Sequence, residues 1–371
     1  MKIEKSLRYS LVFFIVPTLF VVSIVPCVRA DEIMLRTLTD CPPSTFNPLQ
    51  AARDICQSVW FSGLLYEPLV LELFNGSLVP WLAKSWEILD NGTRYVFHLD
   101  ERAKWSDGKP VTAHDVEVTW NLTWTYARPS LLVGVLEDVR AVDTYTVEFI
   151  TNRTWFRWAA DFGTRAILPA HIWINLTDPL SYDFINDPTK HITTSAFKYD
   201  SFETGQWWLF KKRPDYWKTE SMPKIDGVVI IYNPDMGNWP LLLQKGDVDI
   251  IEINFHQVAA VVGKPNINVW VNPVQRAQEF LFINHRLYPL NLKEVRQAID
   301  LAIDKVEIAQ NYFMGYGYPA NRTNFDMATY PEFYVPEAAW LGWGKTHEER
   351  IAEANAILDS LGFTKGPDGI R

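Results

Sequence analysis

The chain has 371 residues, of which 48% are hydrophobic and 14% aromatic, so it is long enough to bury a large core in about two or three domains. Its formal net charge is −9, and removal of residues 1–30 would leave 31 basic and 43 acidic side chains, or about −12. This acidic balance argues against nucleic acid or an anionic membrane surface as a partner.

The first 30 residues have the pattern of a secretory signal peptide. Basic residues precede an apolar run over 11–25, and the small-residue sequence VRA (28–30) offers a cleavage site. An uncleaved N-terminal anchor is the alternative, because the apolar run is nearly long enough to span a bilayer. Cys27 follows the sequence IVP, which is a poor lipobox for a lipid-anchored cysteine. We therefore expect an exported protein.

Only Cys41 and Cys56 remain after residue 30. Two cysteines in an exported chain allow one disulfide, and two free buried thiols are the alternative. They are too few for a zinc or iron–sulfur centre built on thiolates, and we predict no metal site and no cofactor. Six N-x-S/T sequons fit an exported, glycosylated surface protein: Asn75, Asn91, Asn121, Asn152, Asn175 and Asn321.

The sequence KWSDGKPVTAHDVEVTW (104–120) places acidic residues and His114 between tryptophans, as a metal or acid–base site would. A structural interpretation accounts for it better. Residues 106–110 have the composition of a turn, and Thr112 with Asp115 is typical of a helix N-terminus. His114 is then a solvated residue of the first turn.

Strand patterns occur on both sides of this stretch. Residues 94–99 alternate as a half-buried strand does, and 197–202 with 206–212 flank a turn as a hairpin. Apolar runs predict further strands over the segments 228–232, 248–253 and 280–284.

Two helices are predicted near the C-terminal end. Apolar residues recur at helical spacing over 292–313 and again over 347–361, where Thr346 and Glu349 form a capping box and Gly362 ends the helix. Strands and helices without fixed alternation predict a mixed α/β or α+β protein with several lobes. The chain lacks the G-x-S-x-G, H-E-x-x-H, Walker and G-x-G-x-x-G signatures, so no catalytic residue is predicted.

The segment PWLAKSWEILDNGTRYVFHLDERAKWSDGKPVTAHDVEVTW (80–120) closely resembles the signature region of the family 5 extracellular solute-binding proteins, the dipeptide-, oligopeptide-, nickel- and oligosaccharide-binding receptors of ABC importers. Three further blocks follow in the family's order: SAFKYDSFETGQWWLFKKRPDYW (195–217), LLLQKGDVDIIEI (241–253) and FLFINHRLYPLNLKEVRQAIDLAIDKVEI (280–308). Two departures stand out. Arg213 replaces a usual Asn, and residues 193–197 (TTSAF) replace a Gly-x-Gly-Pro-Tyr-like turn that lies near the cleft in family members.

The resemblance implies a two-lobed fold of the periplasmic-binding-protein (Venus flytrap) type, in which a hinge lets the lobes close on a ligand. The expected organisation is a signal peptide (1–30), a split first lobe (31–69 and 193–272), a domain inserted in that lobe (70–192) and the start of the second lobe (273–371). Because family members run well beyond 371 residues, we expect the second lobe to be C-terminally incomplete.

The resemblance also implies a monomer at the extracellular face of the cytoplasmic membrane or in the periplasm, with or without a membrane anchor, that docks on ABC permease subunits. A peptide ligand is favoured because peptide binders dominate the family, and an oligosaccharide is the alternative because 16 tryptophans and 15 tyrosines offer flat faces for sugar rings. An exported hydrolase with an unrecognised carboxylate pair is a remote third hypothesis. The candidate ligand contacts are Asn47, Trp60, Trp207, Trp239, Gln278, Phe280 and Asn284.

Overall fold

The computed structural model describes residues 32–54, 56, 61–73, 76–127, 129, 131–270, 281–317, 319 and 340–370. The predicted signal peptide lies outside these residues. The α-helices are α1 (Ser62–Leu65), α2 (Ala113–Leu122), α3 (Ala170–Trp173), α4 (Trp239–Lys245), α5 (Phe255–Val261), α6 (Lys293–Ala302), α7 (Lys305–Glu307) and α8 (His347–Ser360). The short 3₁₀ or π turns are η1 (Pro48–Arg53), η3 (Asp90–Gly92), η4 (Thr123–Ala127), η5 (Ala159–Gly163), η6 (Pro179–Ser181), η7 (Pro188–Lys190), η8 (Thr219–Ser221), η9 (Met236–Asn238) and η10 (Ile308–Tyr312).

A four-stranded mixed sheet joins the beginning of the described chain to its middle. Its order is β1-β10-β9-β8, with β1 parallel to β10 and the other neighbours antiparallel. The strands are β1 (Met34–Thr39), β8 (Phe197–Glu203), β9 (Trp207–Lys212) and β10 (Gly227–Tyr232). The predicted hairpin over 197–212 and the predicted strand over 228–232 are confirmed.

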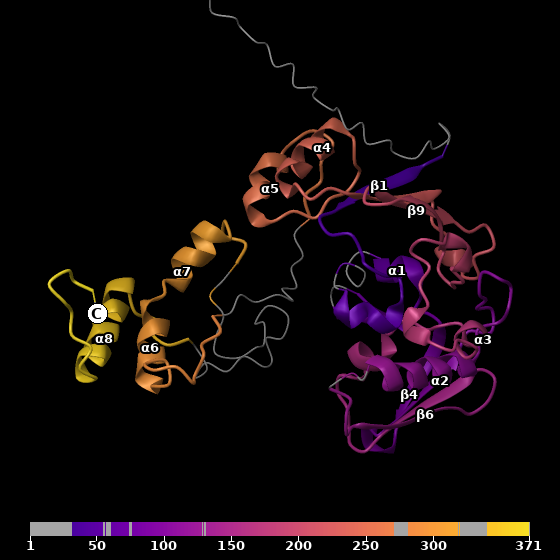
Figure 1. Ribbon diagram of the computed structural model, residues 1–371, viewed down its shortest axis with the longest axis horizontal. Coiled ribbons are helices and arrows are strands. Elements are labelled where there is room, and N and C mark those ends of the chain that lie inside the picture. The colour runs from indigo at the N-terminus through magenta and orange to yellow at the C-terminus, as the bar shows by residue number, and fades with distance from the viewer. Residues whose placement is uncertain are drawn as a thin grey trace, which may run out of the picture.

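A second four-stranded sheet is antiparallel throughout, in the order β4-β5-β7-β6. The predicted strand over 94–99 is confirmed as β5, and α2 packs against β6 and β7 (Figure 1). A two-stranded hairpin, β2 with β3, precedes this sheet. The strands are β2 (Val70–Glu72), β3 (Leu78–Pro80), β4 (Ala83–Leu89), β5 (Arg94–Leu99), β6 (Leu136–Ala141) and β7 (Thr146–Thr151).

The sequence before α2 behaves as the structural interpretation predicts. Thr112 and Asp115 form a capping box, in which the Thr112 backbone N–H donates to the Asp115 carboxylate at 2.7 Å. Gly108 bends the preceding turn at a φ of +85°, which a residue with a side chain adopts only under strain. Trp120 is buried on the inner face of the helix, whereas His114 is exposed.

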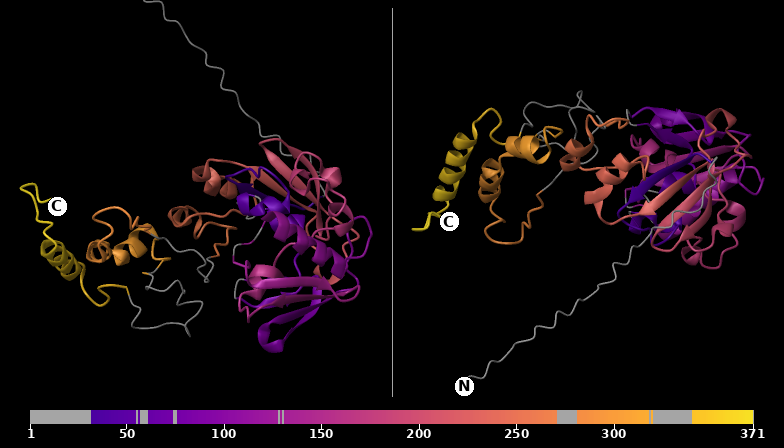
Figure 2. Two further views of the ribbon diagram at one scale, coloured as in Figure 1. Left: turned by 60° about the horizontal axis from the view of Figure 1, so that its bottom comes forward. Right: turned by 90° about the horizontal axis from the view of Figure 1, so that it is seen from above.

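One continuous buried cluster joins the two large sheets. Phe46 lies 5.1 Å from Phe61 and 5.2 Å from Tyr199, measured between ring centroids, on the side of the first sheet. Phe149 of β7 stacks on Phe162 at 4.7 Å in the same cluster. Because they share this aromatic core, the two sheets with α1, α2 and α3 form one packed body (Figures 1 and 2).

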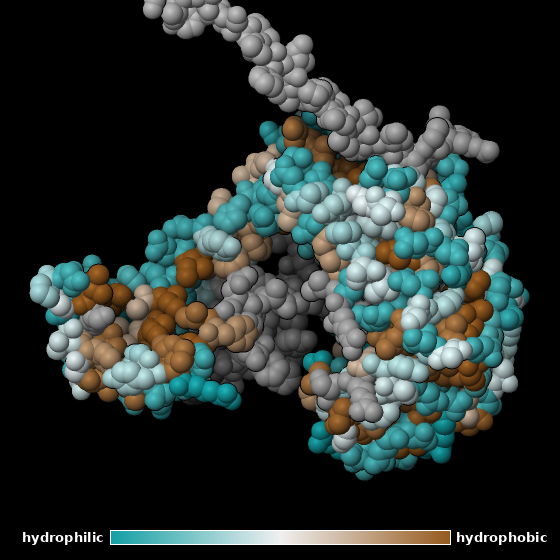
Figure 3. Space-filling model, in the orientation of Figure 1, coloured by the Kyte–Doolittle hydropathy of each residue, from teal (hydrophilic) through white to brown (hydrophobic). Residues whose placement is uncertain are grey.

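A smaller part of the chain lies apart from this body. Helices α6 and α8 pack together around Ala298, Leu301 and Ala354, and Figures 1 and 2 show them away from the two sheets. Figure 3 shows apolar side chains gathered on this smaller part, where Val306 and Met314 are among the exposed ones.

The predicted helix over 347–361 is confirmed as α8, with the predicted capping box between Thr346 and Glu349. The predicted continuous helix over 292–313 is wrong in its middle. It breaks at Ile303, whose backbone is extended, and α7 starts anew because the Asp304 carboxylate accepts hydrogen bonds from the next backbone N–H groups.

Two predicted strands are wrong within the described residues. Residues 248–253 form no strand and only one isolated bridge, between Ile250 and Thr37. The Asp249 carboxylate accepts a hydrogen bond from the Arg36 backbone N–H at 2.7 Å. This N–H is therefore not available to a backbone carbonyl of 248–253, as a β-ladder with β1 would require. Residues 281–284 also lack a ladder, and Phe282 is exposed.

Candidate ligand-binding site

A cavity of about 270 Å³ opens between η1 and α1 on one side and α2 and η5 on the other. The described walls are mostly apolar, with side chains of Pro48, Leu49, Leu65 and Leu168, and Arg165 contributes a cation. An apolar concave surface with a few polar groups is the general form of a small-molecule site.

Arg165 lies where this cavity meets a second one of about 220 Å³, because it lines both. Its guanidinium packs on the ring of Trp120, with 5.3 Å between the guanidinium carbon and the ring centroid. Its Nε is buried without a hydrogen-bond partner, and the guanidinium forms no ion pair within the described part of the chain.

The carboxylate nearest in sequence to Arg165 is already engaged. Asp161 accepts hydrogen bonds from Trp155 Nε1 at 2.8 Å and from Arg157 Nε at 3.3 Å. Burial lowers the pKa of Arg165, and the charge of Asp161 acts in the opposite direction. Because arginine keeps its proton in proteins, the cavity wall carries a positive charge without a direct counter-ion among the described residues.

Two hydroxyls in the wall are bound to the protein's own backbone. Thr119 Oγ1 donates to the Asp115 carbonyl at 2.6 Å and accepts from the Leu168 N–H at 2.9 Å. Thr164 Oγ1 donates to the Ala160 carbonyl at 3.1 Å. These two hydroxyls are therefore already engaged, whereas the partly exposed Arg165 side chain forms no hydrogen bond with a described residue.

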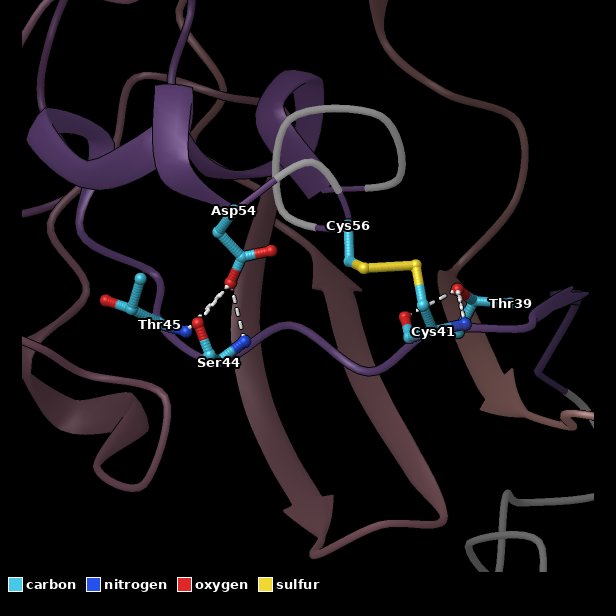
Figure 4. Close-up of a disulfide and its surroundings, with 6 residues drawn as sticks. All are labelled: Thr39, Cys41, Ser44, Thr45, Asp54 and Cys56. Atoms are coloured by element: carbon cyan, nitrogen blue, oxygen red, sulfur yellow. Dashed lines mark hydrogen bonds between the residues drawn. A yellow bond between two sulfur atoms is a disulfide. The ribbon is translucent and has the colours of Figure 1, made fainter.

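Cys41 and Cys56 form a disulfide (Figure 4). In the sequence they lie on either side of Pro48 and Leu49, which belong to the cavity wall. The Cα atoms are 5.8 Å apart, so of the two alternatives left by the sequence the structure has the bond. Asp54 tightens the same loop by accepting hydrogen bonds from Ser44 N and Oγ at 2.6 and 2.7 Å. Together these contacts fix the segment between β1 and α1, from which Pro48 enters the cavity wall.

Asn47 is a predicted ligand contact whose side chain is fully buried. Its Nδ2 donates to the carbonyls of Pro179 and Leu180 at 2.8 and 3.1 Å, and its Oδ1 accepts from the Leu49 N–H at 2.9 Å. The amide thereby ties η1 to η6. A role in ligand binding stays a prediction.

The other predicted contacts are dispersed in the structure. Trp239 is buried in a small cluster with Leu38 and Val248, and its Nε1 donates to the Asn233 carbonyl. Trp207 is partly exposed on β9, and the exposed Asn284 accepts the Arg286 N–H at 3.0 Å. Neither cavity has Asn47, Trp207, Trp239 or Asn284 in its described wall. Trp60, Gln278 and Phe280 lie outside the described residues.

Four of the six predicted glycosylation sites can be placed. Asn91, Asn121, Asn152 and Asn175 are exposed, as attachment of a glycan requires. Asn75 and Asn321 lie outside the described residues. Use of the sequons stays a prediction.

The two departures from the family pattern contact each other. Arg213 Nη1 donates to the carbonyls of Thr193 and Ser195 at 3.0 and 3.1 Å, and the same guanidinium forms a bidentate pair with Asp215. Thr193 and Thr194 have no exposed surface. Arg213 thus holds the unusual segment 193–197 inside the protein.

Glu67 is a buried carboxylate that no described cation neutralises. It accepts hydrogen bonds from Trp81 Nε1 at 2.9 Å, Tyr216 Oη at 2.7 Å and Trp217 Nε1 at 3.1 Å. Desolvation raises the pKa of Glu67, and these donors oppose that shift. The arrangement joins the chain before β2 to the segment after β9.

Asp107, in the turn before α2, and Asp115, in the first turn of α2, are engaged by other groups of the protein. The Asp115 carboxylate accepts from Thr112 N and from Ala170 N at 2.8 Å, and Asp107 pairs with His171 at 2.8 Å near the surface. Within the described residues, no group of three or more His, Cys, Asp and Glu side chains could hold a metal ion.

A mixed α/β fold with an apolar cavity and one charged group in its wall has the general form of a small-molecule-binding protein. Residues 77–371 match the sequence model of the bacterial extracellular solute-binding proteins, family 5 (middle region), and the chain belongs to that family. None of the described helices is long and apolar enough to cross a membrane.

Curated relatives include the dipeptide-binding protein of Escherichia coli, 24% identical over 93% of this chain and 66% of its own length. Another is the nickel-binding periplasmic protein of the same organism, 21% identical over 92% of this chain and 63% of its own length. The chain therefore spans somewhat less than two thirds of the length of these relatives.

Solved structures show the same fold. A periplasmic oligopeptide-binding protein of Thermotoga maritima, solved with mannohexaose bound, has a TM-score of 0.72 and 25% identity. The match covers 92% of this chain and 66% of that one. A Campylobacter jejuni protein in complex with Ni(L-His) has a TM-score of 0.68 at 21% identity. The two-lobed periplasmic-binding-protein fold expected from the sequence is thereby confirmed.

Proposed function

We propose that this chain is the substrate-binding protein of an ABC importer, which captures a dipeptide or oligopeptide and delivers it to a membrane permease. The observation that carries the proposal is the family match over residues 77–371. Relatives named for dipeptide and oligopeptide binding support peptide as the ligand. Ligand would favour a closed state through contacts that the open state lacks.

The proposed organisation keeps the boundaries expected from the sequence. Pairing of β1 with β10 brings residues 34–39 and 227–232 into one sheet, which supports a first lobe split between 31–69 and 193–272. The second large sheet uses only residues 83–151, which supports an inserted domain over 70–192. The second lobe would begin near 273.

An oligosaccharide is the second candidate ligand. The Thermotoga maritima structure named for oligopeptide binding contains mannohexaose, so a sugar fits a protein of this fold. The exposed ring of Trp124 offers a flat apolar face of the kind that stacks on sugar rings.

The remaining parts of the proposal concern context. The protein would be exported, act as a monomer without cofactor or nucleic acid, and carry out no turnover. Relatives named as periplasmic support an extracytoplasmic location, and the exposed sequons support a glycosylated surface. A membrane anchor is compatible with this role.

Native mass spectrometry of the 371-residue chain, purified without denaturation, tests the proposal. We expect a co-purifying peptide and, after its removal, saturable binding of peptides in titration calorimetry with no product formed. If the purified protein retains only oligosaccharide, the ligand is an oligosaccharide and not a peptide. Turnover of either compound would instead establish the hydrolase hypothesis.

A further inference from the structure

We propose that the cavity beside α1 and α2 binds the carboxylate group of the ligand, with Arg165 as its counter-ion. The inference rests on the proposed binding function and narrows its ligand to a molecule with one carboxylate next to an apolar group. A peptide C-terminus and an aliphatic acid share this chemistry.

The charge of Arg165 is unpaired among the described residues. The side chain is partly exposed and forms no hydrogen bond or ion pair with any of them, and Asp161, the nearest carboxylate in sequence, is held by Trp155 and Arg157. The guanidinium instead packs on the face of Trp120, which orients it but accepts no N–H. A planar fork of donors held in one place matches a carboxylate, which accepts two parallel hydrogen bonds.

The cavity also has a suitable size and lining for such a ligand. The cavity has a volume of about 270 Å³, and its described walls beside Arg165 are apolar at Leu49, Leu65 and Leu168. Such walls favour an aliphatic or aromatic group attached to the carboxylate. A phosphate carries more charge and more acceptor atoms than one guanidinium satisfies, so the described wall fits a carboxylate better.

Arg165 also accounts for selectivity between charged and neutral ligands. The chain carries a net charge of −9, so long-range electrostatics do not attract anions to it. Recognition of a carboxylate therefore has to come from a local cation, and Arg165 is the cation in the described walls of both cavities. A neutral oligosaccharide would leave that charge unpaired.

Paired probes test this assignment. Calorimetric titrations of the 371-residue chain would compare the tripeptide Ala-Ala-Phe with its C-terminal amide, and hexanoate with hexanamide. We expect each acid to bind at least about tenfold more tightly than its amide, as loss of a charge-assisted hydrogen bond predicts. The variants Arg165→Gln and Arg165→Met should abolish this difference.

Arg153→Gln is the matched control. Arg153 is exposed and also lies over a tryptophan, 5.8 Å from the ring centroid of Trp155, but it is in neither cavity wall. It should keep the preference for acids. Circular dichroism and thermal unfolding of each variant separate a loss of binding from a loss of fold.

The outcomes distinguish this inference from the proposed function. Equal binding of tripeptide acid and amide, or a preference that survives both Arg165 variants, would overturn the carboxylate site and leave the peptide function intact. Arg165-dependent binding of hexanoate without binding of either tripeptide would support the site and overturn the peptide function. Failure of all four probes would overturn both.

Discussion

Removal of the bond between Cys41 and Cys56 should lower the free energy of unfolding by about 3 kcal/mol. The bond joins residues 15 positions apart. Closing a loop of about 15 residues removes chain entropy from the unfolded state worth roughly 3 kcal/mol at 25 °C. For a body of roughly 200 residues, this corresponds to a decrease in Tm of about 6–12 °C.

The assay is thermal and urea unfolding of the double variant Cys41→Ser/Cys56→Ser, followed by circular dichroism and tryptophan fluorescence. Reductant should move the parent protein to the midpoint of the double variant and leave the variant unchanged. Cys27→Ser, in the predicted signal peptide, is the matched cysteine control and should unfold like the parent.

A particular result would refute this reasoning. Thiol titration could show that Cys41 and Cys56 are fully reduced in the parent, with the parent and the double variant unfolding at the same midpoint. In that case the loop does not limit the entropy of the unfolded chain. A loss far above 3 kcal/mol would point instead to contacts between the loop and the folded body, with the hydrogen bonds of Asp54 as the first to examine.

Three further predictions concern other buried or strained positions. Arg213→Ala should cost about 3 kcal/mol in urea unfolding, because it leaves buried carbonyls without their donor, and a cost below 1 kcal/mol would contradict that role. Because burial raises the pKa of Glu67, the unfolded chain releases this proton first and stability falls as pH rises above about 4.5. Tyr216→Phe removes a donor to the Glu67 carboxylate, so its cost in urea unfolding should be larger at high pH, where this group is charged, than at low pH, by up to about 1–3 kcal/mol, and a cost independent of pH would refute this. Gly108→Val should lower the Tm, because a φ of +85° strains a β-branched residue by about 1–2 kcal/mol or more, whereas His114→Ala should leave both Tm and ligand affinity nearly unchanged in the same thermal and calorimetric assays.

Local patterns were sufficient to predict the elements whose partners are adjacent in sequence. The hairpin of β8 and β9, the strand β5 and the capping boxes of α2 and α8 depend on short-range alternation and capping, and all are confirmed. The segment 248–253 failed because its apolar pattern conceals Asp249, whose side chain takes the Arg36 N–H.

The candidate site was harder to predict, because its walls come from segments far apart in sequence. The cavity combines residues between 48 and 66 with others between 119 and 168. No local sequence pattern predicts that these two segments lie side by side. One signal was available: Arg165 immediately precedes the apolar run Ala166-Ile167-Leu168, which places a cation where burial is expected.

The parallel pairing of β1 with β10 has a consequence for the order of folding. Ile33 and Asp226 meet beside this pair although they are 193 positions apart in sequence. During synthesis, β1 therefore has no native neighbour until the chain through Tyr232 has emerged. Its unpaired edge is exposed to wrong partners throughout that interval, and the late closure of so long a loop makes completion of this sheet a slow step.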